Sequence, residues 1–205
     1  MRLGVLGGTF DPIHVGHVAV ARAALDCLDL DRLLVVPARV PPHKAAASAE
    51  VSDRLEMCRL AVADLPRTEV VDIEVRREGP SYTAETLEEL SEANPGADLR
   101  LILGWDAARL LSEWHEPWRV LELARPAIFR RPGVAGPSGQ DLESAGIDPE
   151  RVTVCDADTP DVDATDIRRR AAAGENLAGL VPQPVADYIR DRGLYAGAAG
   201  HNSPH

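Results

Sequence analysis

Two histidines flanking a glycine stand in the part of the chain best suited to chemistry. His14 and His17 lie three residues apart where a helix is expected to start, so both imidazoles can face one side. Gly16 between them carries no side chain that could obstruct a ligand. Imidazoles can donate to phosphate oxygens, where negative charge accumulates during phosphoryl or nucleotidyl transfer. Metal ligands or inert surface residues could share this spacing, although no nearby Cys, His or carboxylate run completes a zinc set.

A glycine-rich turn precedes the histidines. Residues 2–17 read R-L-G-V-L-G-G-T-F-D-P-I-H-V-G-H, a short apolar run that ends in Gly7 and Gly8 and is followed by a D-P turn. This pattern predicts a buried strand, a tight loop and a helix that begins near Val15. Glycines let the backbone approach an anion, and the N–H groups of a first helical turn point at it. The common G-x-G-x-x-G and P-loop fingerprints are absent.

Composition indicates a folded α/β protein. The chain has 205 residues, of which 45% are apolar and 4% aromatic, so the core must be built from aliphatic side chains. We expect one domain over residues 1–195, with a small C-terminal helical appendage, and a disordered tail over 196–205. The net charge of −11 argues against a nucleic-acid partner. It does not exclude a nucleotide, since a few cations in one cleft outweigh a diffuse acidic surface.

Cysteine usage and hydropathy indicate the cellular compartment in which the protein works. Cys27, Cys58 and Cys155 are scattered and odd in number, which favours buried thiols in a reducing compartment over a disulfide framework. We expect no signal peptide, and no apolar run approaches about 18 residues. The sequence therefore predicts a soluble cytoplasmic protein without a membrane partner.

Strands and helices are expected to alternate along the chain. This order predicts a Rossmann-like open parallel sheet with helices on both faces. After the first strand and helix, strands are expected at 32–37, 68–75, 99–103, 127–129 and 152–155. Helices are expected from residue 52 and at 81–93, 107–113, 117–124, 164–173 and 184–192, with a mobile surface loop at 133–146.

Three further segments place polar residues at strand ends or helix starts. Lys44 follows two prolines in a loop that leaves the second strand, where it could reach a phosphate or be a solvated loop lysine. Residues 80–87 (P-S-Y-T-A-E-T-L) start a helix with Ser81 or Thr83 as N-cap, and an anion could settle there. Asp106 follows the fourth strand and could take a ribose hydroxyl or cap a helix.

A basic helix start completes the set. Residues 162–170 read V-D-A-T-D-I-R-R-R, and Asp163 with Asp166 resembles a capping box. Three arginines then fall early in the helix, where the dipole disfavours cations unless an anion is nearby. Arg168 is thus a candidate phosphate ligand, with a solvated basic face as the alternative.

These motifs together resemble one enzyme family. G-G-T-F-D-P-I-H-V-G-H (7–17) is similar to the H-x-G-H signature of the nucleotidyltransferase superfamily and, in this long form, to the bacterial nicotinate-nucleotide adenylyltransferases. P-P-H-K, S-Y-T-x-x-T-L, a G-x-D motif with a tryptophan eight residues later, F-R-R-P-G and the C-terminal segment to residue 195 resemble the same family in order. The chain departs from the superfamily's I-S-S-T-x-I-R, because Asp163 and Ala164 replace two serines.

The resemblance implies adenylyl transfer from ATP to nicotinate mononucleotide, giving deamido-NAD and pyrophosphate in NAD biosynthesis. Mg²⁺ is expected to arrive with ATP and not in a protein metal site. The implied catalytic residues are His14, His17, Lys44 and Arg168. ATP would bind at Gly7, Gly8, Thr9, Phe10, His14, Gly16, His17, Asp106, Thr165 and Arg168. The mononucleotide would bind at Lys44, Tyr82, Thr83 and Trp114, with the indole against the pyridinium ring.

Two alternatives stay open at this point. One is transfer to another acceptor, such as nicotinamide mononucleotide or phosphopantetheine. The other is a nucleotide-sensing module that uses the same fold without catalysis. The sequence also leaves a homo-oligomer open.

Overall fold

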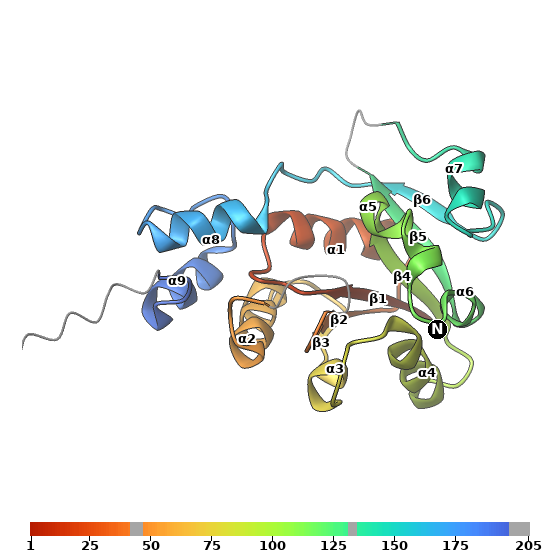
Figure 1. The fold of residues 1–205 in the computed structure, drawn as a ribbon, viewed down its shortest axis with the longest axis horizontal. Helices are drawn as coiled ribbons and strands as arrows, with labels where there is room; N and C mark the ends of the chain where they lie inside the picture. The colour runs from red at the N-terminus through yellow and green to blue at the C-terminus, as the bar shows by residue number, and fades with distance from the viewer. Residues whose placement is uncertain (42–46, 131–134, 197–205) are drawn as a thin grey trace, which may run out of the picture.

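Six parallel strands form one sheet in the order β3-β2-β1-β4-β5-β6 (Figure 1). The structure is a computed structural model that describes residues 1–41, 47–130 and 135–196. The strands are β1 (Arg2–Gly8), β2 (Arg32–Pro37), β3 (Thr68–Val70), β4 (Asp98–Gly104), β5 (Ala124–Arg130) and β6 (Thr153–Asp156). The predicted Rossmann-like parallel sheet is therefore confirmed. Its order reverses between β1 and β4, and in such sheets ligands bind beyond the carboxyl ends of the strands at this point.

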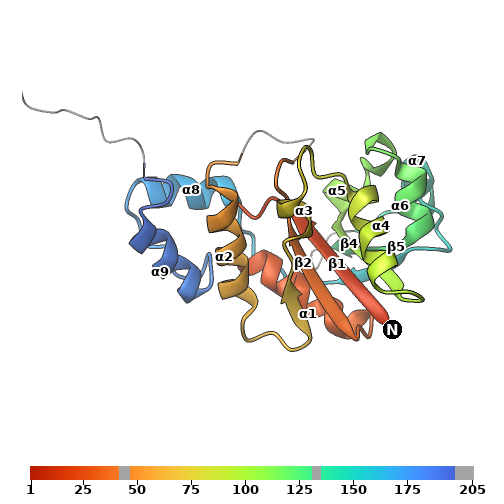
Figure 2. The same cartoon turned by 90° about the horizontal axis from the view of Figure 1, so that it is seen from below.

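Helices cover both faces of the sheet, because each face carries its own apolar cluster. One cluster packs α1 (Val15–Cys27), α2 (Val51–Val62), α8 (Ala164–Ala172) and α9 (Gln183–Arg192). The other packs α3 (Ile73–Arg76), α4 (Thr83–Ala93), α5 (Trp105–Ala108), the 3-10 helix η1 (Leu111–Glu113), α6 (Pro117–Leu123) and α7 (Gly139–Ser144). Figures 1 and 2 show α1 on one side of the sheet and α3 and α4 on the other.

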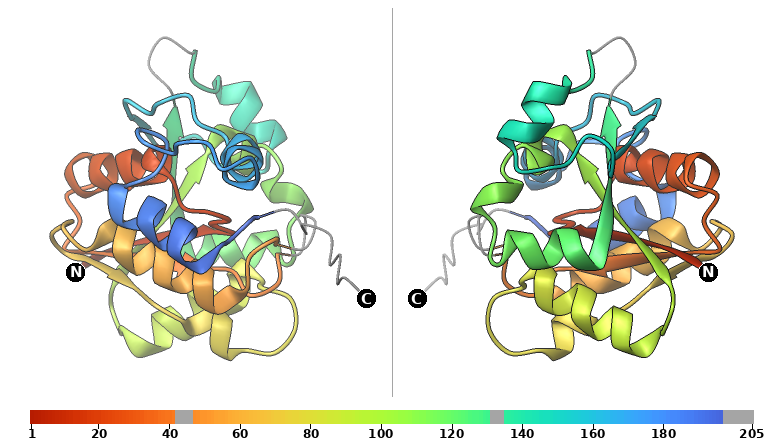
Figure 3. Two further views of the ribbon diagram at one scale, coloured as in Figure 1. Left: turned by 90° about the vertical axis from the view of Figure 1, so that its left-hand side faces the viewer. Right: turned by 90° about the vertical axis from the view of Figure 1, so that its right-hand side faces the viewer.

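The C-terminal helices belong to the apolar cluster of the first face. Helix α9 packs against α2, as the left view of Figure 3 shows. Val185 and Ile189 of α9 are buried in the cluster that also contains Met57 of α2. The expected C-terminal helical appendage is thus part of the main core.

Burial of both sides of the central strands explains why they read as continuous apolar runs and not as alternating ones.

The predicted strand over 68–75 is wrong beyond residue 70. Only Thr68, Glu69 and Val70 pair with β2, and the chain then turns into the short helix α3. Ile73 and Glu74 are both buried although they are neighbours, which a strand with one covered face does not permit. Asp72 and Arg76 form an i,i+4 ion pair on the solvent side of this turn. The alternation of Val70, Asp72 and Glu74 was therefore misleading.

Two other segments also differ from the prediction. The loop predicted over 133–146 contains helix α7, because Ser138 and Asp141 form a reciprocal capping box and Leu142 is buried. The helix predicted over 107–113 is divided into α5 and η1. The predicted tail lies mostly outside the described residues, which end at Ala196.

The cysteine prediction is wrong for two of the three residues. Cys27, exposed at the end of α1, forms a disulfide with Cys155, which is buried on the edge strand β6. Cys58 is a buried free thiol, as expected. Nothing in the spacing of 128 residues indicates the pairing, because it depends on where α1 crosses the sheet. Within the described residues, no helix is long and apolar enough to cross a membrane.

Reduction of this disulfide should lower stability without altering the start of α1, where the two histidines lie. Closing a long loop restricts the unfolded chain, so Cys27→Ser should cost about 2–4 kcal/mol of unfolding free energy. The bond lies at the far end of α1, about 20 Å from its first turn. Thermal unfolding with and without a thiol reductant measures the effect. A reductant that lowers Tm of the Cys27→Ser variant as much as that of the wild type would contradict this prediction.

Candidate active site

The loop after β1, residues 7–14, is shaped by one close contact and is called the phosphate loop below. A Cβ added to Gly8 would lie 2.9 Å from the Phe10 ring, so only glycine lets this ring fold back over the strand end. Phe10 adopts a positive φ of 48° and is buried. The peptide bond between Asp11 and Pro12 is cis. The chain thereby reverses direction and delivers His14 to the N-cap of α1.

The two histidines are held face to face at the start of α1. Their ring centroids lie 3.7 Å apart at an angle of 28°, and the Phe10 ring meets His17 edge-on at 5.0 Å. The backbone N–H of His14 donates to Nδ1 of His17 at 3.2 Å. Because Nδ1 accepts, the proton of neutral His17 belongs on Nε2. The predicted juxtaposition of the histidines is present, and His17 is oriented to donate through Nε2.

Gly16 fits tightly beside this pair. A Cβ at this position would lie 3.1 Å from Nδ1 of His14 and 3.7 Å from the carbonyl oxygen of Pro160. The glycine therefore makes room for the His14 ring, whereas the Pro160 carbonyl, in the loop that follows β6, lies at an ordinary contact distance. That loop leads directly into α8, which carries Arg168.

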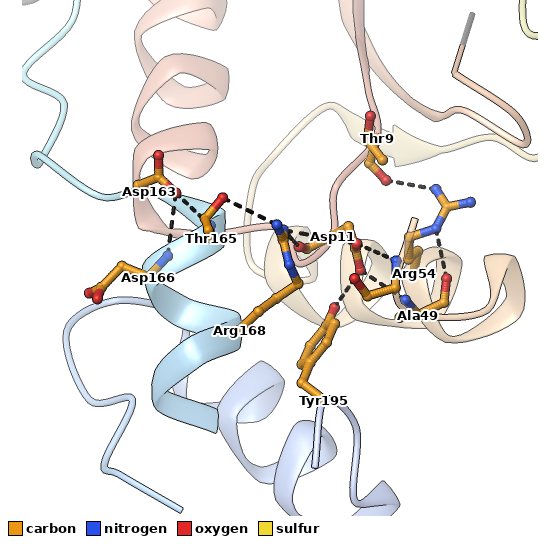
Figure 4. Close-up of polar contacts among 10 residues, drawn as sticks. Thr9, Asp11, Ala49, Arg54, Asp163, Thr165, Asp166, Arg168 and Tyr195 are labelled. Carbon is orange, nitrogen blue, oxygen red and sulfur yellow. Dashed lines mark hydrogen bonds and ion pairs between the residues drawn. The ribbon is translucent and has the colours of Figure 1, made fainter. Parts of the chain in front are cut away.

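Asp11 links the phosphate loop to Arg168. Its buried carboxylate accepts hydrogen bonds from the backbone N–H groups of Ser48 (2.7 Å) and Ala49 (3.1 Å) and from the Tyr195 hydroxyl (2.8 Å). Its carbonyl oxygen accepts a 2.7 Å hydrogen bond from Arg168, whose guanidinium also lies 3.9 Å from the carboxylate. Figure 4 shows these groups gathered from four segments of the chain.

Arg54 fixes the same loop from the other side. Its guanidinium is almost fully buried and donates to the carbonyl oxygens of Thr9 and Ala38, each at 2.6 Å. Further hydrogen bonds reach the carbonyls of Arg39 and Ala49. Burial lowers the pKa of Arg54, and the neighbouring Asp11 carboxylate opposes that shift. No pattern in the sequence indicates this role.

Helix α8 begins at the predicted residue, but only the Asp163 half of the predicted capping box is present, because the Asp166 carboxylate binds Arg169 and Arg170 instead. The Asp163 carboxylate caps the helix by accepting hydrogen bonds from the backbone N–H groups of Thr165 and Asp166. These hydrogen bonds, led by that of Thr165, lower the pKa of Asp163. Arg168 donates to the Thr165 hydroxyl at 3.2 Å. The aspartate that replaces a family serine therefore supplies the helix cap itself.

A pocket of about 170 Å³ opens beside the phosphate loop. Backbone of the loop, the start of α4 and the end of η1 surround it. Of the predicted residues it brings together Gly7, Gly8, Thr9, Tyr82, Thr83 and Trp114. The other polar lining residues, whose side chains the sequence did not single out as ligands, are Glu74, Ser81, Thr86 and His115. The His115 ring stacks on Tyr82 with a centroid distance of 4.1 Å.

The start of α4 is open toward this pocket. The N-cap residue is Tyr82 and makes no side-chain capping bond, so the predicted capping by Ser81 or Thr83 is wrong. Ser81 instead accepts a 2.9 Å hydrogen bond from the backbone N–H of Arg39. The first N–H groups of a helix have no intrahelical acceptor. They therefore remain available to a ligand in the pocket.

Glu74 is a buried carboxylate on the wall of the pocket. It accepts a 2.7 Å hydrogen bond from the Thr86 hydroxyl, which in turn accepts one from Arg77 at 3.0 Å. Burial raises the pKa of Glu74, while hydrogen bonds from Thr86 and Ser81 and the charge of Arg77 oppose the shift. The alternation around this residue predicts a strand, which concealed its position in the pocket.

Not every predicted residue joins the site. The Asp106 side chain is fully exposed, lies 3.8 Å from Arg109 and does not line the pocket. It does not cap α5, whose N-cap is Gly104. Trp105 packs against the apolar cluster on its face of the sheet. Lys44 lies outside the described residues.

The comparisons with known proteins agree with this geometry. Residues 5–170 match the cytidylyltransferase-like family, a span that runs from β1 through Arg168. The solved structure of Plasmodium falciparum nicotinic acid mononucleotide adenylyltransferase complexed with NaAD has the same fold, with a TM-score of 0.79, 18% identity and coverage of 95% of this chain and 97% of that one. The fold and site thus define a nucleotidyltransferase.

Full-length relatives narrow the class. A probable nicotinate-nucleotide adenylyltransferase of Synechococcus sp. (strain JA-3-3Ab) is 41% identical over 95% of this chain and 94% of its own length. Another, of Roseiflexus sp. (strain RS-1), is 43% identical over 94% of this chain and 97% of its own length. The chain belongs to the nicotinate-nucleotide adenylyltransferase family.

Replacement of Glu74 should change how stability depends on pH. Because its pKa is raised in the folded protein, the stability that Glu74 contributes is present below its unfolded pKa and is lost as the pH rises through the folded value. Glu74→Gln removes this ionisation. Relative to wild type, the variant should therefore gain stability as the pH rises from about 4.3, the pKa of an unperturbed Glu, through the raised pKa of Glu74 in the folded protein.

Thermal unfolding across this range measures the difference in Tm. Glu85→Gln is the matched control, because Glu85 is much more exposed and also pairs with Arg77. A Tm difference between Glu74→Gln and wild type that stays constant with pH would contradict a raised pKa at Glu74.

Proposed function

We propose that this protein transfers the adenylyl group of ATP to nicotinate mononucleotide, forming deamido-NAD and pyrophosphate in NAD biosynthesis. The observation that carries the proposal is the shared phosphate loop, with a histidine pair on one side and a pocket containing an open helix N-terminus on the other. Two nucleotides bound on these two sides would meet at the loop. The family relationship supports the same reaction.

The reaction needs no protein nucleophile. The mononucleotide phosphate is largely ionised at neutral pH, because its second pKa is near 6. One of its oxygens attacks the α-phosphorus of ATP, a new P–O bond forms, and the bond between that phosphorus and the α,β-bridging oxygen breaks. The electron pair leaves with pyrophosphate. The protein's contribution is to align the two phosphates and to stabilise the charge that develops on them.

The groups around the phosphate loop suit this task. Nε2 of His17, and the His14 ring stacked on it, would donate to oxygens of the α-phosphate. Arg168 would bind the β- and γ-phosphates while its 2.7 Å bond to the carbonyl oxygen of Asp11 keeps it beside the loop. Lys44 is proposed on the same phosphates from its sequence position. The backbone of residues 7–10 would approach the adenylate, with Gly16, Asp106 and Thr165 completing the ATP site.

A divalent cation would be held mainly by ATP. Among the described residues, no three His, Cys, Asp or Glu side chains gather into a group that could hold a metal. Mg²⁺ typically binds through substrate phosphates and waters and needs few protein ligands. A site without a cluster of protein ligands therefore suits an Mg²⁺ ion that is carried by ATP. The ion would neutralise charge on the triphosphate and the departing pyrophosphate.

The pocket suits the pyridine end of the mononucleotide. Trp114 presents an aromatic surface there, and an indole face attracts a pyridinium cation. The N–H group of Thr83 would receive the nicotinate carboxylate, and the N–H group of Tyr82 would exchange its 3.2 Å bond to the Pro80 carbonyl oxygen for the same ligand. Glu74 also lines the pocket, and a carboxylate would favour the NH₂ group of an amide. Two of its acceptor sites already serve the hydroxyls of Ser81 and Thr86, which reduces this preference for an amide.

We further propose that residues 1–195 act as one nucleotidyltransferase domain in the cytoplasm, with nucleotides as substrates. The packing of α8 and α9 into the core of the sheet supports one domain. No nucleic acid or membrane enters the reaction. Oligomerisation is not required by this mechanism.

Loss of the His17 imidazole should slow the chemical step. His17→Ala should lower kcat by roughly 100- to 1,000-fold, the usual effect of removing one donor to transition-state charge. The fold should survive, because this half-buried side chain lies in the first turn of α1 and not in the core. Pyrophosphate release with saturating ATP and mononucleotide measures kcat, and the Tm checks folding. A folded variant with nearly full kcat would remove His17 from the mechanism.

The enzyme should prefer the acid over the amide. Backbone N–H groups suit an acceptor-only carboxylate, whereas a carboxamide NH₂ would face another donor. One buried polar group left unpaired costs about 1–3 kcal/mol, and charge-assisted bonds add to the difference. We expect kcat/KM to favour nicotinate over nicotinamide mononucleotide by about tenfold to a hundredfold.

Trp114→Ala is the control for this preference. It should weaken both substrates and leave their ratio largely intact, since stacking depends on the ring and not on its substituent. Equal kcat/KM for the two mononucleotides in the wild type would exclude the proposed carboxylate site, although adenylyl transfer would stand.

A further inference from the structure

The C-terminal segment supplies two tyrosine hydroxyls to two buried aspartates. Tyr188 donates to Asp53 and Tyr195 donates to Asp11, each at 2.8 Å. Both aspartates are buried, with 6% of each residue exposed. Asp53 belongs to α2 and lies in the packing contact with α9, whereas Asp11 belongs to the phosphate loop. The two bonds are alike in chemistry but end in different parts of the molecule.

A left-handed turn directs Tyr195 to the loop. Helix α9 ends at Arg192, the C-cap Gly193 has a φ of 61°, and the backbone N–H of Leu194 donates back to the Ile189 carbonyl at 2.9 Å. Tyr195 itself has a φ of 63°, so the chain turns again and carries the ring inward. Burial, reinforced by the Asp11 charge, raises the pKa of Tyr195, so the phenol keeps the proton that it donates. The backbone conformation of residues 193–195 thus places the Tyr195 hydroxyl on Asp11.

The contact bears on Arg168 through Asp11. One Asp11 oxygen, Oδ1, accepts the Tyr195 hydroxyl and the longer of the two backbone bonds, from Ala49. The other, Oδ2, lies 3.9 Å from Arg168, which hydrogen bonds to the Asp11 carbonyl and not to the carboxylate. Without the phenol, Oδ1 would lose a donor in a buried place. A buried carboxylate that lacks a donor attracts the nearest cation.

We propose that Tyr195 is a positioning residue for ATP: by satisfying Asp11 it keeps the Arg168 guanidinium from closing onto the carboxylate and leaves it for the β- and γ-phosphates. The proposal rests on the ATP site of the proposed function. It concerns neither the histidine pair nor the mononucleotide pocket. Tyr195 therefore controls ATP affinity from the C-terminal end of the described chain, 184 residues from Asp11.

The matched variants Tyr195→Phe and Tyr188→Phe test this role. Each removes one oxygen and one hydrogen bond to a buried aspartate, so both should lower Tm by similar amounts. Only Tyr195→Phe should weaken ATP. We expect about a tenfold rise in the Kd of a non-hydrolysable ATP analogue, measured by calorimetry. KM for the mononucleotide should stay within about twofold of wild type in both variants.

A double-mutant cycle with Arg168→Ala identifies the path. If Tyr195 acts through Arg168, Tyr195→Phe should cause no further loss of ATP-analogue affinity in the Arg168→Ala background. Additive losses would overturn the proposal, as would equal Kd values for the two tyrosine variants. A rise in KM for the mononucleotide equal to the loss of ATP affinity would also overturn it, because that pattern indicates general loosening.

Binding of the ATP analogue does not depend on nicotinate mononucleotide. The role of Tyr195 can therefore be tested separately from the proposed adenylyl transfer. Wild-type protein that binds the analogue but releases no pyrophosphate with nicotinate mononucleotide would contradict the proposed function alone. The comparison of the tyrosine variants would then still decide the role of Tyr195.

Discussion

The buried carboxylate of Asp11 is the interaction on which the site depends. A carboxylate removed from water must be matched by donors, since leaving one oxygen unsatisfied costs more than an ordinary hydrogen bond gains. Here the donors come from Ser48 and Ala49 after β2 and from Tyr195 after α9. Arg168 of α8 binds the carbonyl of the same residue. The phosphate loop can therefore take this shape only when these remote segments have reached their places.

The constraint divides the site into two parts with different physics. Around Asp11 and Arg54, charged groups are buried and hydrogen bonded to backbone atoms, which gives the proposed triphosphate side a fixed frame. The pocket on the other side is lined by apolar and aromatic groups, with the first turn of α4 and the buried Glu74 as its polar features. Gly7, Gly8 and Thr9 belong to both parts. Reaction between two bound nucleotides requires such a shared boundary, because the phosphates must meet in line.

Local patterns in the sequence predicted the frame of the molecule well. Short apolar or alternating runs indicated six strands in order, although the third was predicted too long, and the spacing of His14 and His17 indicated their contact. The cap of α8 at Asp163 followed from residue types alone. These features depend on neighbours within a few residues, where backbone geometry restricts the outcome.

The features that were missed depend on distant partners. Arg54 looked like any helical arginine, and its burial arises only when the loops after β1 and β2 close around it. The Cys27–Cys155 bond and the Tyr195–Asp11 contact span 128 and 184 residues, and no local pattern encodes such pairs. Glu74 was missed for a different reason. The alternation over residues 70–74 fits a strand, and no local pattern shows that the chain leaves the sheet after Val70. Helix α7 was predictable from Ser138 and Asp141, but the surrounding glycines and prolines outweighed that signal.

The central claim is that two nucleotides meet at the phosphate loop, with His17 on the α-phosphate. A crystal structure with a non-hydrolysable ATP analogue and nicotinate mononucleotide tests it most directly. The account predicts an α-phosphate oxygen about 2.7–3.2 Å from Nε2 of His17 and a mononucleotide carboxylate on the N–H groups at Tyr82 and Thr83. A triphosphate bound away from His17, or a pyridine ring outside the pocket, would contradict it.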